Sequence, residues 1–283
     1  MSDSSGDYDP IRDALIDHVK AFNGPGISYC YPRSPVYIHL PKPLKEVGSI
    51  FFQAIMPKNI RLGMWEFTKK GDMKNIWGNM TLNGYGGWFR VTSSNVKAGN
   101  TDQYEWHNSD VGRVCKVFEH GGEHFVELHL DKETGDLVTK VDGLVYNIHD
   151  MEDGADADEF TMYGDFYLPE VAIPFDDFKL PYAVDLNGGV CFADVYEITF
   201  VPDEKARDMT ITFGDVKFTI DFRDHREAMG KYSREKVTIN SHCNCAFISL
   251  NNKIVHEVMR RLTATQMVIE GDIKLHHVTV RKK

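Results

Sequence analysis

The sequence predicts an all-β protein: two antiparallel β-sandwich domains in tandem, preceded by a short N-terminal helix. Three observations support this prediction. From about residue 35 onward the chain consists of short alternating or apolar runs separated by Gly, Asp and Asn, which is typical of strands. A segment of the first half recurs in the second half. Only the first two dozen residues contain apolar residues at helical spacing.

The predicted helix lies near the start of the chain. Asp9 is a typical N-cap, Pro10 suits the first helical turn, and Gly24 is a typical C-terminal stop. Between them an apolar stripe recurs at helical spacing, comprising Ile11, Leu15, Val19 and Phe22. We therefore expect one amphipathic helix within residues 1–24.

The repeat sets the expected domain boundaries. TMYGDFYLPEV begins at Thr161 and VIEGDIKLHHV begins at Val268, so that Gly164 and Gly271 are 107 positions apart. Each segment follows a hairpin signal, in which the turn is DG in the first copy and NN in the second. The closing strand of the first copy should end near Pro174. We predict an acidic N-terminal segment and helix over 1–24, a first domain over 25–174 and a second over 175–283.

The second copy is shortened in its middle. From Gly48 to Gly164 the chain advances 116 positions, but from the matching Gly189 to Gly271 it advances only 82, which leaves 34 fewer residues. The central strands of the second domain should therefore be fewer or shorter.

Composition excludes several classes of protein. Hydrophobic residues make up 42% and charged residues 26% of 283 residues, which argues against disordered and fibrous chains. A net charge of -10 makes nucleic acid an unfavourable partner. No apolar run is long enough for a membrane span, and the acidic start lacks the apolar core of a signal peptide. Five scattered cysteines suit reduced thiols, so we expect a cytoplasmic protein, with non-classical secretion as the alternative.

The ends of each repeat carry a family resemblance. Pro43, Leu44 and Gly48 form a Pro-Leu-x-x-x-Gly turn before an apolar strand, Gly164 and Gly271 begin a closing Gly-Asp hairpin strand, and EHGGEHFVELHL precedes a V-D-G turn. In this order the segments resemble galectins, the β-sandwich lectins that bind β-galactosides. The resemblance implies galectin-like, jelly-roll domains and carbohydrate binding without catalysis.

The same resemblance indicates where a sugar would bind. The family uses His-x-Asn-x-Arg on one strand, Val-x-Asn on the next and a stacking tryptophan on the third. In this chain Asn79, Thr81 and Asn83 stand at the first pattern, Ser93 at the second, and Trp106 at the stacking position. The residue types differ from the family's, and Ser109 and Val111 stand where its Glu and Arg are expected, so the site should not be a standard galactoside site.

Other interpretations of these residues stay open. Trp106 could be a packing residue, and Asn79, Thr81 and Asn83 could be an ordinary solvated strand face. In the second copy, Asp221, Arg223 and His225 stand at the first pattern, and all four tryptophans lie in the first copy. We therefore expect no galactoside site in the second copy.

Neither a cofactor nor a metal is expected. Cys243 and Cys245 beside His242 lack a second ligand pair at the spacing of zinc sites. No nucleophile elbow, phosphate-binding loop or zinc-protease motif occurs, so we do not expect an enzyme. The predicted function is a lectin whose partners are glycans or glycoconjugates. The alternative is a protein-interaction module that kept the sandwich and lost the sugar site.

Overall fold

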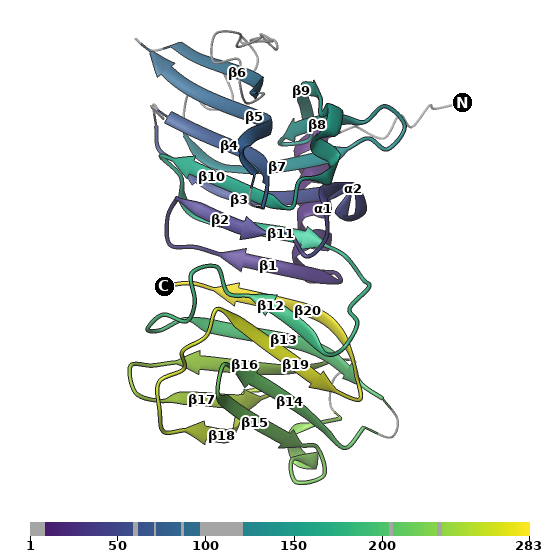
Figure 1. The fold of residues 1–283 in the computed structure, drawn as a ribbon, viewed down its shortest axis with the longest axis vertical. Helices are drawn as coiled ribbons and strands as arrows, with labels where there is room; N and C mark the ends of the chain where they lie inside the picture. The colour runs from purple at the N-terminus through teal and green to yellow at the C-terminus, as the bar shows by residue number, and fades with distance from the viewer. Residues whose placement is uncertain are drawn as a thin grey trace, which may run out of the picture. The chain divides into compact units, whose positions relative to one another are not determined.

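The computed structural model describes residues 9–58, 62–70, 72–85, 88–96, 121–203, 206–230 and 234–283. These residues are mostly strand, which confirms the all-β prediction (Figure 1). The chain divides into two compact units. The first contains residues 1–22 and 33–171, and the second contains residues 23–32 and 172–283.

The first unit is built from two sheets. In its larger sheet the strand order is β11-β3-β7-β8-β9, and in its smaller sheet it is β2-β10-β4-β5-β6. The strands are β2 (Val36–His39), β3 (Ser49–Met56), β4 (Leu62–Lys69), β5 (Asp72–Tyr85), β6 (Trp88–Val96), β7 (Gly122–Leu130), β8 (Asp136–Val141), β9 (Leu144–Asp150), β10 (Glu159–Gly164) and β11 (Tyr167–Pro174). The short helices are α2 (Leu44–Val47) and the 3-10 helix η1 (Glu152–Asp156).

Large apolar side chains fill the space between these two sheets. Trp65 and Phe67 of β4 are fully buried, as are Phe52 of β3 and Phe160 of β10. The ring of Phe52 lies 5.3 Å from that of Trp65 and 6.0 Å from that of Phe160, measured between centroids. Because alternate residues of a strand point to opposite faces, the other residues of these strands form the outer faces of the sandwich.

The N-terminal helix and the two hairpins form where the sequence predicts them. Helix α1 spans Pro10–Asn23, and the Asp9 carboxylate caps it by accepting hydrogen bonds from the N–H groups of Ile11 (3.1 Å) and Arg12 (3.2 Å). Asp142 and Gly143, both at positive φ, connect β8 to β9. Asn251 and Asn252, also at positive φ, connect β17 (Ala246–Leu250) to β18 (Lys253–Val258).

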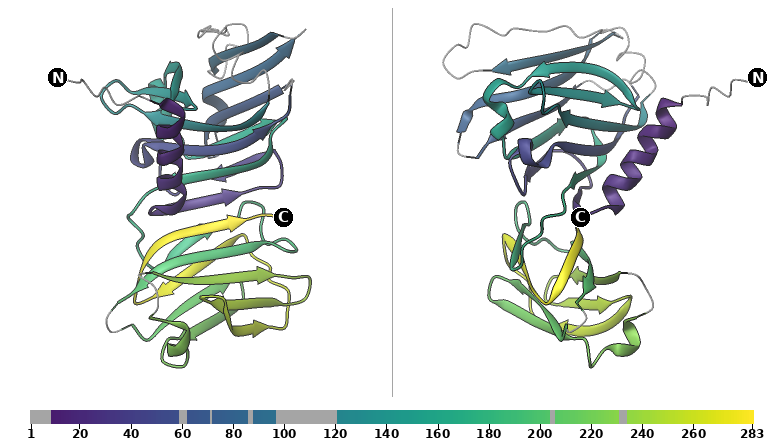
Figure 2. Two further views of the ribbon diagram at one scale, coloured as in Figure 1. Left: turned by 180° about the vertical axis from the view of Figure 1, so that it is seen from behind. Right: turned by 90° about the vertical axis from the view of Figure 1, so that its right-hand side faces the viewer.

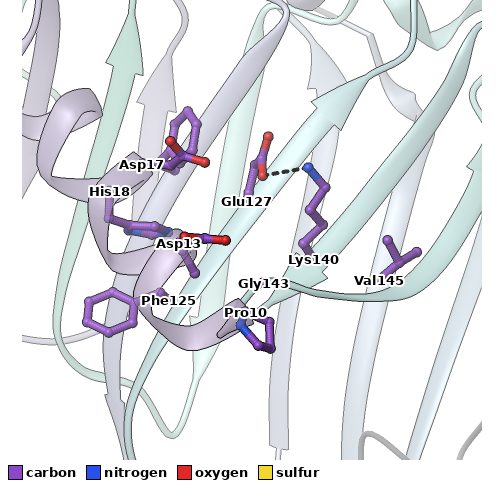
Figure 3. A pocket seen from close by; sticks show the side chains of 11 residues that line it. Pro10, Asp13, Asp17, His18, Phe125, Glu127, Lys140, Gly143 and Val145 are labelled. Atoms are coloured by element: carbon purple, nitrogen blue, oxygen red, sulfur yellow. Dashed lines mark hydrogen bonds and ion pairs between the residues drawn. The ribbon is translucent and has the colours of Figure 1, made fainter. Parts of the chain in front are cut away.

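Three of the four residues of the apolar stripe of α1 are exposed, contrary to its predicted amphipathic role, and only Phe22 is partly buried. Ile11, Leu15 and Val19 are 59%, 44% and 52% exposed, whereas His18 and Ala21 are buried. Helix α1 lies on the outer face of the larger sheet, where the His18 ring contacts Phe51 and Phe125 at centroid distances of 5.3 and 5.0 Å (Figure 2). The Pro10 carbonyl comes so close to Gly143 that a side-chain methyl group on residue 143 would clash with it (Figure 3). The helix face that is buried is therefore the one that approaches Gly143 and contacts the rings of Phe51 and Phe125.

Burial of His18 should make the first unit acid-sensitive. Burial lowers the pKa of His18 from 6.5 to about 4, against the opposing effect of Asp142 and Asp17. Between those two pH values the unfolded chain binds a proton that the folded chain does not, so stability falls as the pH falls. We expect a loss of about 3 kcal/mol from this group between pH 7 and 4. Urea titrations of wild type and His18→Phe across this range test it, and equal slopes of unfolding free energy against pH would contradict it.

The second unit repeats the architecture with a smaller sheet. Its larger sheet has the order β18-β17-β16-β13-β20-β1, and its smaller sheet has the order β12-β19-β14-β15. The remaining strands and the 3-10 helix are β1 (Gly26–Cys30), β12 (Tyr182–Asp185), β13 (Val195–Pro202), β14 (Asp208–Phe213), β15 (Val216–Asp221), η2 (Arg226–Ala228), β16 (Glu235–Ser241), β19 (Gln266–Gly271) and β20 (Ile273–Arg281). Within the described residues, β15 is the last strand of its sheet and has 6 residues, against 14 in β5. The shortening inferred from the 34-residue difference therefore lies at the β15 edge of the smaller sheet.

Strand β1 belongs to the second unit, although the sequence places residues 25–32 in the first domain. It pairs in parallel with β20, from Gly26 opposite His277 to Cys30 opposite Arg281. The His277 Nδ1 atom lies 2.6 Å from the Gly24 carbonyl oxygen, and its Nε2 lies 2.9 Å from Ser28 Oγ. This long-range pair is parallel, whereas β13 pairs with the other edge of β20 in antiparallel fashion. The independent folding of domains 25–174 and 175–283 stays a prediction.

The Gly-Asp segments do not form hairpins, contrary to the expectation from the resemblance. Gly164 ends β10 in the smaller sheet of the first unit, and β11 then enters the larger sheet; Gly271 separates β19 from β20 in the same way. The φ angles of these glycines are 125° and 136°, which residues with a Cβ rarely adopt. Glycine is needed here because the chain crosses from one sheet to the facing one.

Candidate functional site

The outer face of the smaller sheet in the first unit carries a regular array of polar and aromatic side chains. Strand pairing places Tyr37, Thr161 and Glu66 in one row across β2, β10 and β4. His39, Glu159 and Thr68 form the row beside it. Cross-strand partners share a face, and their neighbours Ile38, Phe160 and Phe67 are buried in the core. This array is therefore the solvent-facing side of the sheet.

Close polar contacts link the array across the strands. His39 Nδ1 lies 3.1 Å from Glu159 Oε1, and the Thr68 hydroxyl donates to Glu159 Oε2 at 3.1 Å. Two positions beyond Thr161 on β10, the Tyr163 hydroxyl lies 3.4 Å from Glu66 Oε2 and 3.3 Å from Met64 Sδ. These contacts hold the two carboxylates on the outer face of the sheet, while Tyr37 remains 61% exposed.

The partly buried Glu66–Tyr163 pair has shifted pKa values. Burial raises the pKa of Glu66, and the hydrogen bond from Tyr163 partly offsets this rise. Burial and the nearby Glu66 carboxylate raise the pKa of Tyr163 to about 12, so its hydroxyl keeps its proton at neutral pH. A protonated phenol and a fixed carboxylate can donate to and accept from the hydroxyl groups of a ligand.

Four of the five predicted sugar-binding residues lie on the strands that continue this sheet. Asn79, Thr81 and Asn83 stand at alternate positions of β5, and Ser93 stands on β6. By register Thr81 is opposite Met64 of β4, which places it in the row of Tyr163. Trp106 lies outside the described residues. The assignment of all five to a sugar site stays a prediction.

Register also separates Ser93 from the other three predicted residues. Its partner on β5 is Met80, the residue between Asn79 and Thr81. The β6 residues opposite Asn79, Thr81 and Asn83 are Ser94, Thr92 and Arg90. Thr92, Ser94 and Arg90 thus occupy the register positions that extend the rows of the outer face.

The array on β2, β10 and β4 was not singled out from the sequence. The signal was present, because VYIH, MWEFT and EFTMY each alternate apolar and polar or aromatic residues. However, β2 and β10 are about 120 residues apart, and alternation within a strand does not reveal which strands are neighbours.

The matching positions in the second unit do not form a strand face, contrary to the prediction. Strand β15 ends at Asp221, and Arg223 and His225 follow it outside any strand. The Arg223 guanidinium folds back on the Asp221 carboxylate at 2.6 and 3.1 Å and lowers the pKa of Asp221 to about 2. Arg223 and Asp221 thus form an ion pair with each other in this turn. They do not form a strand face that could bind a ligand, although they are two residues apart in the sequence.

The described residues provide no candidate metal centre. Cys191, His242 and Cys243 line a pocket of about 250 Å³ in the second unit. However, no group of three or more His, Cys, Asp or Glu side chains among the described residues is arranged to hold a metal ion. In the same part of the chain, no helix is long and apolar enough to cross a membrane.

Comparison with known proteins identifies similar folds and no similar sequences. No protein-family model matches the chain, and no curated protein matches it. Among solved structures, the galectin LEC-6 of Caenorhabditis elegans is 10% identical, covers 52% of this chain and 96% of its own, and has a TM-score of 0.41. Congerin II with lactose and MES is 13% identical, covers 50% of this chain and all of its own, and has a TM-score of 0.40.

A third similar structure, sheep galectin-11 in complex with glycerol, is 14% identical. It covers 36% of this chain and 98% of its own, with a TM-score of 0.29. The likeness to these galectins is one of fold. Identity is at most 14% and each of these TM-scores is below 0.5, so the likeness carries no information about function.

Proposed function

We propose that this chain is a non-enzymatic carbohydrate-binding protein that holds a glycan on the outer face of the smaller sheet in its first unit. The ligand is a glycan or glycoconjugate that differs from a standard galactoside. Asn79, Thr81 and Asn83 of β5 continue this site, and Trp106 also contacts the glycan; Ser93, predicted with them, has Met80 as its register partner and is the least favoured of the five. We further propose a cytoplasmic location, with non-classical secretion as the alternative.

The array on β2, β10 and β4 carries this proposal. It combines an exposed aromatic ring (Tyr37), two carboxylates (Glu66 and Glu159) and hydroxyl groups (Thr68 and Tyr163) on one sheet face. Aromatic rings stack on the apolar faces of sugar rings, and fixed carboxylates accept hydrogen bonds from sugar hydroxyls. The carboxylates are held by neighbouring side chains before any ligand arrives, which lowers the cost of ordering them.

Replacing either proposed stacking residue should weaken glycan binding strongly. By analogy with other aromatic stacking, one ring contributes about 1 to 3 kcal/mol, which corresponds to roughly fivefold to over a hundredfold in affinity. We therefore expect Tyr37→Ala and Trp106→Ala each to lose at least about fivefold in affinity for the best ligand found on a glycan array. Isothermal titration calorimetry of the whole chain measures the affinities.

The matched control is Tyr167→Ala, which removes another exposed tyrosine (54% exposed) from β11 in the other sheet. Melting curves establish that each variant folds. Folded variants of Tyr37 and Trp106 that bind as wild type does would place the site elsewhere.

A protein-interaction module is the second candidate function. The exposed Ile11, Leu15 and Val19 of α1 favour it, because apolar stripes on a helix surface commonly bind partner proteins. A wild-type chain that binds no glycan on the array would favour this candidate over the lectin.

A further inference from the structure

Strand β15 ends the smaller sheet of the second unit, and among the described residues no strand pairs with its outer edge (Figure 1). The matching strand of the first unit is β5, whose outer edge pairs with β6. The shortened second copy leaves the corresponding edge uncovered in the described part of the chain. Such an edge presents a row of backbone N–H and C=O groups that can pair with a strand of another chain.

The other edge strands are poorer templates for this kind of pairing. Strands β2 and β12 have only 4 residues each. Strands β6, β9 and β18 pair with their inner neighbours through interrupted registers, and such irregularities hinder the addition of a further strand. Strand β15 has 6 residues and an uninterrupted register with β14 from Val216 to Asp221. Among the described residues it is therefore the edge best suited to pairing.

The register with β14 shows which backbone groups of β15 point outward. Just beyond β15, the Phe222 N–H donates to the Arg207 carbonyl oxygen at 2.8 Å, and this pair continues the register of the two strands. Hydrogen-bonded and non-hydrogen-bonded pairs alternate along an antiparallel ladder. The N–H and C=O groups of Lys217, Thr219 and Asp221 therefore point away from β14 and toward the uncovered edge.

The sequence of β15 is complementary to itself in one antiparallel register. When Thr219 lies opposite Thr219 of a second copy, Lys217 of each copy lies opposite Asp221 of the other, and opposite charges that face each other stabilise a strand pair. The same register makes the three residues with outward-pointing groups the hydrogen-bonded pairs. A lysine normally protects an edge strand from pairing, but here it meets a carboxylate. Backbone geometry and charge thus select the same alignment.

We propose that β15 pairs in antiparallel fashion with β15 of a second copy of this chain, about a two-fold axis at Thr219. The same patch serves both copies, so the assembly closes as a dimer. Phe218 and Ile220 already lie in the core at 3% and 1% exposure, so the pairing adds backbone hydrogen bonds and ion pairs but little apolar burial. We therefore expect a dimer that dissociates on dilution. The proposal is independent of the glycan site, which belongs to the first unit.

Sedimentation velocity of the full chain over a series of concentrations tests for this dimer. Thr219→Pro removes the central outward N–H but keeps the ladder with β14, and it should weaken dimerisation about tenfold or more. Thr219→Ala is the matched control, because it also loses the hydroxyl that contacts Thr210 at 2.9 Å but retains the N–H. It should stay within about threefold of wild type. A wild-type chain that is monomeric throughout, or equal effects of the two variants, would overturn the proposal.

Exchange of the paired charges tests the register and decides the matter if Thr219→Pro fails to fold. Lys217→Glu and Asp221→Lys each place like charges opposite each other and should weaken dimerisation about tenfold or more. The double variant Lys217→Glu/Asp221→Lys restores opposite charges and should return most of the loss. Lys253→Glu reverses an exposed charge on β18 and should leave dimerisation unchanged. A double variant no better than the single ones contradicts this register.

Cysteine cross-linking locates the two-fold axis. The host chain has every cysteine except the buried Cys30 replaced by serine. In it, Thr219→Cys brings two thiols to strand positions whose Cα atoms are about 5.5 Å apart, which is within the range of a disulfide. Lys217→Cys is the control, because its counterpart lies opposite position 221, four residues away along the strand. Disulfide-linked dimers should form with Thr219→Cys only, and equal cross-linking of both variants excludes an axis at Thr219.

A strand of a different protein, or a segment of this same chain, could occupy the edge instead. Either occupant leaves the purified chain monomeric at every concentration. Amide exchange followed by NMR then distinguishes them at Lys217, Thr219 and Asp221. Rapid exchange identifies an open edge that a different protein would cover, and slow exchange in the monomer identifies a covering segment of the chain itself. Both results refute a second copy as the occupant.

Discussion

Replacing Trp65 with alanine is expected to destabilise the first unit by about 3 to 5 kcal/mol, which is the usual cost of removing a fully buried aromatic side chain. Trp65 has no solvent exposure and packs against Phe52 and Phe166 at centroid distances of 5.3 and 6.2 Å. Phe52 lies on β3 in the facing sheet, and Phe166 lies in the segment between β10 and β11. The cavity left by alanine would therefore open between both sheets, where relaxation of one strand cannot fill it.

Trp65→Phe is the matched control for this cavity. The indole Nε1 is buried and has no hydrogen-bond partner among the described residues, so phenylalanine removes a polar group whose burial is uncompensated. We expect a loss of about 1 to 2 kcal/mol, because only part of the ring volume is missing. Scanning calorimetry and urea unfolding followed by circular dichroism measure both variants. A Trp65→Ala chain as stable as wild type would show that the core does not depend on this contact.

Removing the Lys282 ammonium group is expected to cost the second unit about 3 to 5 kcal/mol, because it leaves a fully buried carboxylate without its cation. Asp194 has no solvent exposure, and its Oδ2 accepts from Lys282 Nζ at 2.8 Å. The same oxygen accepts from the N–H of Cys191 at 2.8 Å and from the Tyr196 hydroxyl at 3.1 Å. The end of the chain is thereby attached to the segment that precedes β13.

The adjacent Lys283 provides a control of equal charge. Its backbone N–H donates to Asp194 Oδ1 at 3.2 Å, and this contact does not depend on its side chain. Lys282→Met should therefore be strongly destabilising, and Lys283→Met should change stability by less than about 0.5 kcal/mol. In the double variant Asp194→Asn/Lys282→Met, part of the loss should return because no unpaired charge remains buried. Equal stability of the two lysine variants would refute the role of this ion pair.

Local features of the fold could be predicted from the sequence because the residues that determine them are close together in the chain. Asp9 and Pro10 specify the start of α1 through contacts within one helical turn. Asp142–Gly143 and Asn251–Asn252 specify their hairpins because these residues tolerate positive φ. The shortening of the second unit could be measured directly from the spacing of its glycines. For the candidate site, period-two alternation predicted that β5 would carry polar residues at alternate positions.

Only the tertiary structure determined which distant segments meet. It decided that β1 pairs with β20, that α1 buries His18 rather than its apolar stripe, and that the chain changes sheets at Gly164 and Gly271. It also brought Tyr37, Glu66 and Glu159 onto one face, from strands about 30 to 120 residues apart. The physical reason is that alternation fixes the two faces of each strand but is nearly the same for every strand. The choice of partners then depends on side-chain packing and on the backbone groups left to be paired, which are properties of the whole fold.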